Sequence, residues 1–260
     1  MREGPAGRDD VAGDVVARLR AGEVVHGTWC SLDADSIVEL LALAGFDVVL
    51  IDLEHGEIGP HDLPRLLRAV TSGGSTSLVR VREVSQLGAA LDAGASIVMA
   101  PDISTPDEAR AVVEACRYAP HGRRGAAPMV RDVGYALRPF AEHVATREPL
   151  IGIQVEGPEG IAALDDLLAV PGVGLVFIGP FDLAVHLGVP GRIDDPLVID
   201  AVSDIARRAA ARGVITGAWA PDARIARRWR EAGVGLIGVD SATTMLARSA
   251  RALVTELSEG

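Results

Sequence analysis

Lysine is absent from this chain of 260 residues, because all 25 of its Lys and Arg residues are arginine. This absence excludes every mechanism that needs a lysine Schiff base, including the lysine-dependent aldolases and the pyridoxal-phosphate enzymes. If the protein activates a carbonyl group, it must therefore use a metal ion or hydrogen bonds.

Aromatic residues and cysteines are also scarce. Aromatics make up 3% of the sequence while apolar residues make up 48%, so the core must be mainly Ala, Val, Leu and Ile. The two cysteines, Cys30 and Cys116, lie far apart and form no CxxC pair. This spacing argues against a structural zinc site and favours two buried free thiols.

Charge and hydropathy patterning exclude further classes of partner. The formal net charge of −11 argues against nucleic acid and anionic membranes. No uncharged apolar run reaches the ~18 residues that span a bilayer, and the N-terminus has no apolar signal segment. No GxGxxG or Walker motif supports nucleotide binding. The sequence predicts a soluble, cytoplasmic protein that binds small molecules.

Eight short apolar runs alternate with longer helical patterns. Runs of this kind are typical of strands buried on both faces, and the alternation predicts a parallel sheet. Eight repeats predict a (β/α)8 TIM barrel over residues 13–260, preceded by a flexible tail at residues 1–12, with a doubly wound sheet as the alternative. The predicted strands are Val24–Trp29, Val48–Ile51, Thr76–Val81, Ser96–Ala100, Leu150–Val155, Leu175–Ile178, Val214–Gly217 and Leu236–Val239.

Helical patterns fill most of the intervals between these strands. Thr105 is predicted to cap a helix that begins at Pro106, with Glu108 completing a capping box, and that extends to Cys116. The connection 117–132 is rich in Gly, Pro and Arg, and loops of this length are usually functional or disordered. The other predicted helices are Asp35–Ala44, Asp62–Val70, Gln86–Ala93, Asp132–Ala145, Gly160–Leu168, Pro196–Arg212, Pro221–Ala232 and Ala242–Leu257.

Two carboxylates follow neighbouring strands, at the end of the barrel where active sites lie. Glu156 follows the fifth predicted strand and Asp182 follows the sixth. Without an added His or Cys they form a hard oxygen site, which suits Mg²⁺ or Mn²⁺. Helix capping is the alternative role, because acidic residues favour helix starts.

Arg80 and His55 are the other chemical groups at this end. Arg80 closes the third strand, where it would hold a carboxylate or a developing enolate oxygen, or form a salt bridge to a barrel carboxylate. His55 follows the second strand and suits a general base, with a structural role as the alternative. Asp52 and Glu54 offer it orienting partners.

These residues lie within motifs that resemble the HpcH/HpaI family of metal-dependent class II pyruvate aldolases. The resemblance extends from about Gly27 to Leu253, and the motifs occur in the family's order. They are Gly27-Thr28-Trp29, Ala44–Asp47 followed by Ile51–His55, Leu78–Val81, Leu91–Ala95, Arg117–Gly125, Gln154–Glu156 and Phe177–Leu183.

The resemblance implies a role for each matching residue. Glu156 and Asp182 would bind a divalent metal, Mg²⁺ or Mn²⁺, with Co²⁺ as a further option. Arg80 would contact the pyruvate oxygen, and His55 would transfer a proton. The supporting residues would be Asp52, Asp92 from a neighbouring subunit, and the pocket residues Gln154, Gly179, Pro180 and Trp29.

The implied protein is a homohexamer, a trimer of dimers, of phosphoenolpyruvate/pyruvate-type barrels whose last helix packs on a partner. It would cleave or form 4-hydroxy-2-oxo acids through a pyruvate enolate, with a 2-oxo acid and an aldehyde as substrates. An acyl-CoA lyase of the malyl or citramalyl type, a 2-oxo acid decarboxylase and a non-enzymatic ligand-binding barrel are the alternatives. Arg82, Gly157-Pro158 and residues 126–138 depart from the family pattern and leave the aldehyde undefined.

Overall fold

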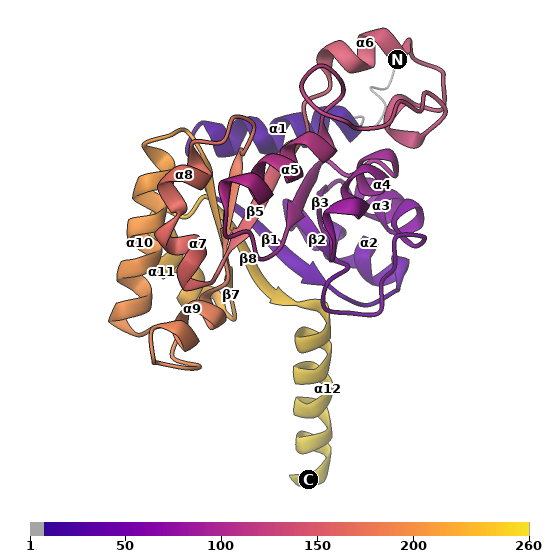
Figure 1. The fold of residues 1–260 in the computed structure, drawn as a ribbon. Helices are drawn as coiled ribbons and strands as arrows, with labels where there is room; N and C mark the ends of the chain where they lie inside the picture. Colours follow the sequence, from indigo (N-terminus) through magenta and orange to yellow (C-terminus); the bar gives the residue numbers. More distant parts are fainter. Residues whose placement is uncertain (1–7, 260) are drawn as a thin grey trace.

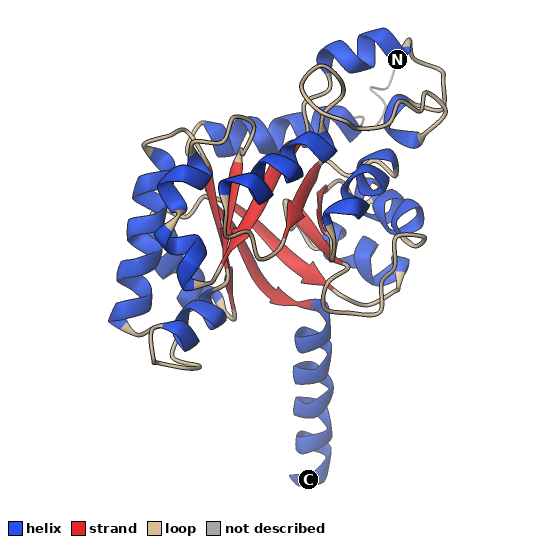
Figure 2. Cartoon of the chain, in the orientation of Figure 1, coloured by secondary structure: helices blue, strands red, loops and turns tan. Residues whose placement is uncertain are grey.

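The computed structural model, which describes residues 8–259, is a closed barrel of eight parallel strands (Figure 1). Each strand pairs with the next in sequence, and β1 pairs with β8 to close the barrel. Helices surround the strands on the outside (Figure 2). The predicted (β/α)8 barrel is therefore confirmed, and the doubly wound alternative is wrong. The strands are β1 (Val25–Cys30), β2 (Val48–Asp52), β3 (Thr76–Arg80), β4 (Ile97–Ala100), β5 (Leu150–Val155), β6 (Leu175–Ile178), β7 (Ile215–Ala220) and β8 (Leu236–Ser241).

The last two strands extend further than the sequence predicts. β7 continues to Ala220 and β8 to Ser241, beyond the predicted ends at Gly217 and Val239. These extra residues lie at the carboxyl end of the barrel, so Trp219 and Ser241 belong to the strands that surround its mouth.

The helices follow the predicted order with local differences. The capping box at Thr105 is confirmed, because its side chain accepts from the amide of Glu108 while the Glu108 carboxylate accepts from the amide of Thr105. None of the described helices is both long and apolar enough to cross a membrane. They are α1 (Arg8–Arg20), α2 (Asp35–Leu43), α3 (Leu63–Ser72), α4 (Leu87–Asp92), α5 (Pro106–Cys116), α6 (Phe140–Thr146), α7 (Pro158–Ala162), α8 (Leu164–Leu168), α9 (Pro180–His186), α10 (Pro196–Ala210), α11 (Ala223–Glu231) and α12 (Ala242–Glu259).

Helix α1 corrects the predicted N-terminal tail. The helix begins at Arg8, so residues 8–12 are helical, while residues 1–7 lie outside the described part of the chain. Val15 and Leu19 are buried and pack with the side chains that fill the barrel. α1 thus covers the amino-terminal end of the barrel, opposite the end where the active site is expected (Figure 1).

The helix predicted at Asp132–Ala145 is wrong. Only a 3-10 turn at Arg131–Val133 and the short α6 form there. Gly134 takes a left-handed φ of 74°, which ends the turn, and Pro139 precedes α6. Asp132 is fully buried, and its carboxylate pairs with Arg124 at 3.0 Å and with Arg147 at 3.1 Å. These ion pairs anchor the long connection beside α1.

The core has two layers, one inside the barrel and one between the strands and the helices. Inside, Phe177 of β6 meets Trp29 of β1 edge to face, with ring centroids 5.8 Å apart. Gly217 on β7 leaves the space for this ring, because a β-carbon there would lie 2.4 Å from Phe177 Cδ2. Both rings line the pocket at the barrel mouth, so the packing of the interior sets the floor of the site.

We predict that Gly217→Ala destabilises the fold, because the added methyl group collides with the buried ring of Phe177. Overpacking of this kind costs about 1–3 kcal/mol of unfolding free energy, which urea denaturation would measure. Gly125→Ala is the matched control, since no atom lies within 4 Å of its added β-carbon. Equal stability of the two variants would contradict this account of the interior.

Candidate active site

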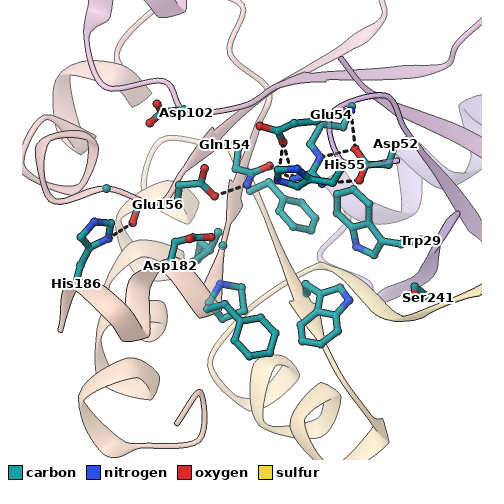
Figure 3. A pocket seen from close by; sticks show the side chains of 18 of the residues that line it. Trp29, Asp52, Glu54, His55, Asp102, Gln154, Glu156, Asp182, His186 and Ser241 are labelled. Atoms are coloured by element: carbon teal, nitrogen blue, oxygen red, sulfur yellow. Dashed lines mark hydrogen bonds and ion pairs between the residues drawn. The ribbon is translucent and has the colours of Figure 1, made fainter. Parts of the chain in front are cut away.

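A pocket of about 700 Å³ opens at the carboxyl ends of the strands (Figure 3). Every strand contributes at least one residue at or close to its carboxyl end, so the predicted convergence on one mouth is confirmed. In strand order these residues are Ser31, Asp52, Arg80, Asp102, Gln154, Ile178, Trp219 and Ser241.

The side chain of Arg80 is fixed by three other polar side chains of the pocket. Its Nε and Nη2 donate to the two carboxylate oxygens of Asp52 at 2.9 and 2.6 Å. Its Nη1 lies 2.9 Å from Glu54 Oε2 and donates to Gln154 Oε1 at 3.2 Å. The β2–β3 register places Asp52 directly opposite Arg80. The salt-bridge interpretation of Arg80 is thus confirmed, and the same guanidinium also lines the pocket.

Trp29 supports this guanidinium from below. The Arg80 guanidinium carbon lies 4.4 Å from the centroid of the Trp29 ring, a cation–π contact. The indole Nε1 faces β8, where a β-carbon on Gly238 would lie 2.8 Å from it. Trp29 lines the pocket as predicted, and its contribution is a flat ring beneath Arg80.

Glu156 and Asp182 approach each other across Gly179. A β-carbon at Gly179 would lie 2.5 Å from Glu156 Oε2 and 3.3 Å from Asp182 Oδ2, so a larger residue would displace the Glu156 carboxylate and crowd that of Asp182. Gln154 Nε2 donates to Glu156 Oε2. Burial raises the pKa of the Glu156 carboxyl, and the charges of Asp182 and Glu54 also raise this pKa. The Gln154 hydrogen bond and the charge of Arg80 lower this pKa, but the net shift is upward.

Within the described chain, neither carboxylate caps a helix through a side-chain hydrogen bond, although Asp182 lies in the first turn of α9, where an acidic residue is favourable. Glycines, Gly157 and Gly179, occupy the N-cap positions of α7 and α9. Among the described residues, neither Glu156 nor Asp182 accepts a capping hydrogen bond from a backbone amide. Capping hydrogen bonds therefore do not account for the closeness of the Glu156 and Asp182 carboxylates.

The donor set fits a hard divalent ion with open coordination positions. In the described part of the chain, no three His, Cys, Asp or Glu side chains gather as a complete ligand group. Two carboxylates are what Mg²⁺-type ions commonly take from a protein, with water and substrate supplying the remaining oxygens. A cation here would also offset the charge repulsion that raises the pKa of Glu156.

His55 lies at the rim of the pocket with its side chain 74% exposed. Its Nε2 is 3.7 Å from Glu54 Oε2. The structure pairs Asp52 with Arg80, so the residue beside the imidazole is Glu54 and not Asp52. Glu54 thereby links Arg80 to His55. The sequence indicated only that Glu54 and His55 are neighbours in the chain.

Asp92 does not line the pocket of its own chain. It ends α4, and its carboxylate accepts from Arg124 Nη2 at 2.7 Å. Its predicted role therefore requires a second copy of the chain. Gly179 and Pro180, by contrast, line the pocket at the start of α9 as predicted.

The pocket also contains residues to which the sequence analysis gave no role. Trp219 and Phe181 form an aromatic wall, with ring centroids 5.1 Å apart. His186 at the end of α9 donates from Nδ1 to the backbone oxygen of Glu156 at 3.0 Å. Asp102 and Glu159 add two carboxylates. Asp102 and Trp219 stand at or just beyond strand ends, which was the available signal for finding them.

Comparisons with known proteins agree with this site. The family model described as HpcH/HpaI aldolase/citrate lyase matches residues 26–248. A hydroxypyruvate/pyruvate aldolase of Sagittula stellata is 37% identical over 245 residues, which cover 93% of this chain and 96% of the relative. A 4-hydroxy-2-oxo-heptane-1,7-dioate aldolase of Klebsiella pneumoniae is 34% identical over 241 residues and 90% of each chain.

A solved structure agrees with these relatives. An HpcH/HpaI aldolase/citrate lyase family protein of Burkholderia cenocepacia has a TM-score of 0.86 at 36% identity, over 94% of this chain and 98% of that one. The family-model match over residues 26–248 contains all eight strands except Val25, the first residue of β1. The chain is therefore an enzyme, a carbon–carbon lyase of the aldolase type, and it belongs to the HpcH/HpaI aldolase/citrate lyase family.

Proposed function

We propose that this enzyme cleaves and forms 4-hydroxy-2-oxo acids, with a pyruvate-type 2-oxo acid and an aldehyde as the two halves. The observation that carries the proposal is the approach of Glu156 and Asp182 beside Gly179, in the same pocket as Arg80. Both relatives are named after 2-oxo acids, which supports a 2-oxo acid as one of the two substrates.

We further propose that Glu156 and Asp182 hold a divalent cation, Mg²⁺ or Mn²⁺, with Co²⁺ as a substitute. Such an ion supplies Lewis-acid activation of the carbonyl group next to the bond that reacts. The chain contains no lysine, so its own residues offer no Schiff base in place of this activation. The neutral amide of Gln154 fixes the orientation of Glu156 within this site.

Arg80 is assigned to the oxygen on which negative charge develops during carbon–carbon cleavage. Asp52 fixes the guanidinium through two parallel hydrogen bonds, and the Trp29 ring supports it from one side. A donor that is already oriented stabilises charge in the enolate without reorganising as it forms. Asp52 acts here as a positioning residue and holds no proton of the substrate.

His55 is assigned to the proton at the aldehyde oxygen. The exposed imidazole at the rim can exchange protons with water, and Glu54 lies 3.7 Å from its Nε2. In the cleavage direction His55 accepts the proton of the 4-hydroxyl group, and in the synthesis direction it returns that proton.

We propose a homohexamer as the assembly and the cytoplasm as the location. Support for the assembly comes from α12, which projects from the barrel (Figure 1) with exposed apolar side chains. Those side chains are Leu246, Leu253, Val254 and Leu257. A partner would also bring Asp92 to a site that this residue does not reach in its own chain.

Metal removal tests the cation. We predict that chelation with EDTA abolishes aldol cleavage and that Mg²⁺, Mn²⁺ or Co²⁺ restores it, because Glu156 and Asp182 repel each other and a divalent cation would offset that repulsion. A coupled assay of pyruvate release would follow the reaction, with circular dichroism to show that the barrel survives chelation. Full activity in EDTA, with the protein confirmed to be metal-free, would contradict the proposed role of the cation.

A pair of variants separates the roles of Arg80 and His55. Arg80→Lys is expected to lower kcat by about 10²–10³ in both aldol cleavage and oxaloacetate decarboxylation, because both reactions form the enolate. His55→Ala is expected to lower aldol turnover by roughly 10²–10⁴ and decarboxylation far less, because decarboxylation has no aldehyde oxygen.

Both assays are to be made at saturating metal, so that a change in metal affinity does not affect the comparison. Equal losses of the two activities in His55→Ala would contradict the division of labour, and His55 would then belong to the enolate step. A mild effect of Arg80→Lys would show that a point charge suffices where the account requires a guanidinium.

A further inference from the structure

The pocket beyond the proposed metal and 2-oxo acid site carries surplus negative charge. Asp102 follows β4, Glu159 lies in the first turn of α7, and both line the pocket (Figure 3 labels Asp102). Among the described residues, neither carboxylate has an ion-pair or hydrogen-bond partner. Both residues are exposed, so their charges lie at the rim of the pocket, where a substrate that extends outward would meet them.

The positive charge of the pocket is already engaged. Within the described residues, Arg80 is the one arginine that lines it, and this guanidinium lies 2.6 Å from Asp52 and 2.9 Å from Glu54. His55 lies against Glu54, and His186 donates to a backbone oxygen. The next guanidinium is that of Arg82, which lies outside the pocket lining and donates from Nη2 to the backbone oxygen of Glu54 at 3.1 Å.

The remaining wall is uncharged. Phe181 and Trp219 present aromatic faces, while Ser31 and Ser241 present hydroxyl groups. Walls of this composition, mainly apolar with a few hydrogen-bonding groups, suit a neutral ligand. Within the described residues that line the pocket, one side therefore repels an anion and the other side carries no cation.

We propose that the acceptor is an uncharged aldehyde and that Asp102 and Glu159 select against aldehydes that carry a carboxylate. The inference rests on the proposed aldol function and adds the class of its second substrate. Like-charge contact with the unwanted substrate is a common source of specificity. At a partly solvated site each such contact is worth about a 3- to 10-fold change in kcat/KM.

Two aldehydes of equal length test the proposal. Succinic semialdehyde and its uncharged amide, 4-oxobutanamide, differ mainly by one negative charge. With saturating Mg²⁺ and pyruvate, kcat/KM is expected to favour the amide by at least about tenfold, and added salt should reduce that preference. Equal or better use of the carboxylate would overturn the proposal, whereas turnover of neither aldehyde would contradict the aldol function itself.

Two pocket variants locate the selectivity. Asp102→Asn and Glu159→Gln are each expected to reduce the amide-to-carboxylate ratio of kcat/KM about threefold, because each removes one repelling charge. Asp107→Asn is the matched control, since it removes the same charge from a 90% exposed position on α5 outside the pocket. A ratio that both pocket variants leave unchanged would overturn the assignment.

Discussion

The bidentate ion pair between Asp52 and Arg80 is the interaction on which the site depends. Both partners are buried at the end of neighbouring strands, so neither charge is tolerable without the other. The pair uses two guanidinium nitrogens and leaves Nη1 against Glu54 and Gln154. Arg80 thus pairs directly with the carboxylates on the β2 side of the pocket. Its charge also acts on Glu156, but the pKa of Glu156 stays raised, so a divalent cation would stabilise Glu156 and Asp182 further.

The barrel produces this separation of charges through its strand register. Asp52 lies opposite Arg80 across β2 and β3, while Gln154 lies opposite Phe177 across β5 and β6. Gln154 then connects the two halves, since its oxygen accepts from Arg80 and its nitrogen donates to Glu156. An amide in this position binds both charge groups while adding no charge of its own.

Much of the fold and of the site was predictable from the sequence, because it depends on patterns within short segments of the chain. Each strand is a short apolar run, and a parallel barrel brings all strand ends to one mouth, so Glu156, Asp182, Arg80 and His55 were expected together. The helix expected at Asp132–Ala145 was wrong because Gly134 and Pro139 outweigh a weak helical pattern. The pairing of Asp52 with Arg80, and not with His55, depends on register, which a single sequence does not supply.

Direct binding of Mn²⁺ to the protein without substrate is the measurement that tests the central claim, that Glu156 and Asp182 form an uncompensated carboxylate pair for a divalent ion. Electron paramagnetic resonance of free Mn²⁺ during a titration gives stoichiometry and affinity without any assay of turnover. We expect one Mn²⁺ per chain, with affinity lowered by at least about tenfold in Glu156→Gln and in Asp182→Asn, and retained in Asp107→Asn. Affinity close to the wild type in both pocket variants, with their fold intact, would contradict it.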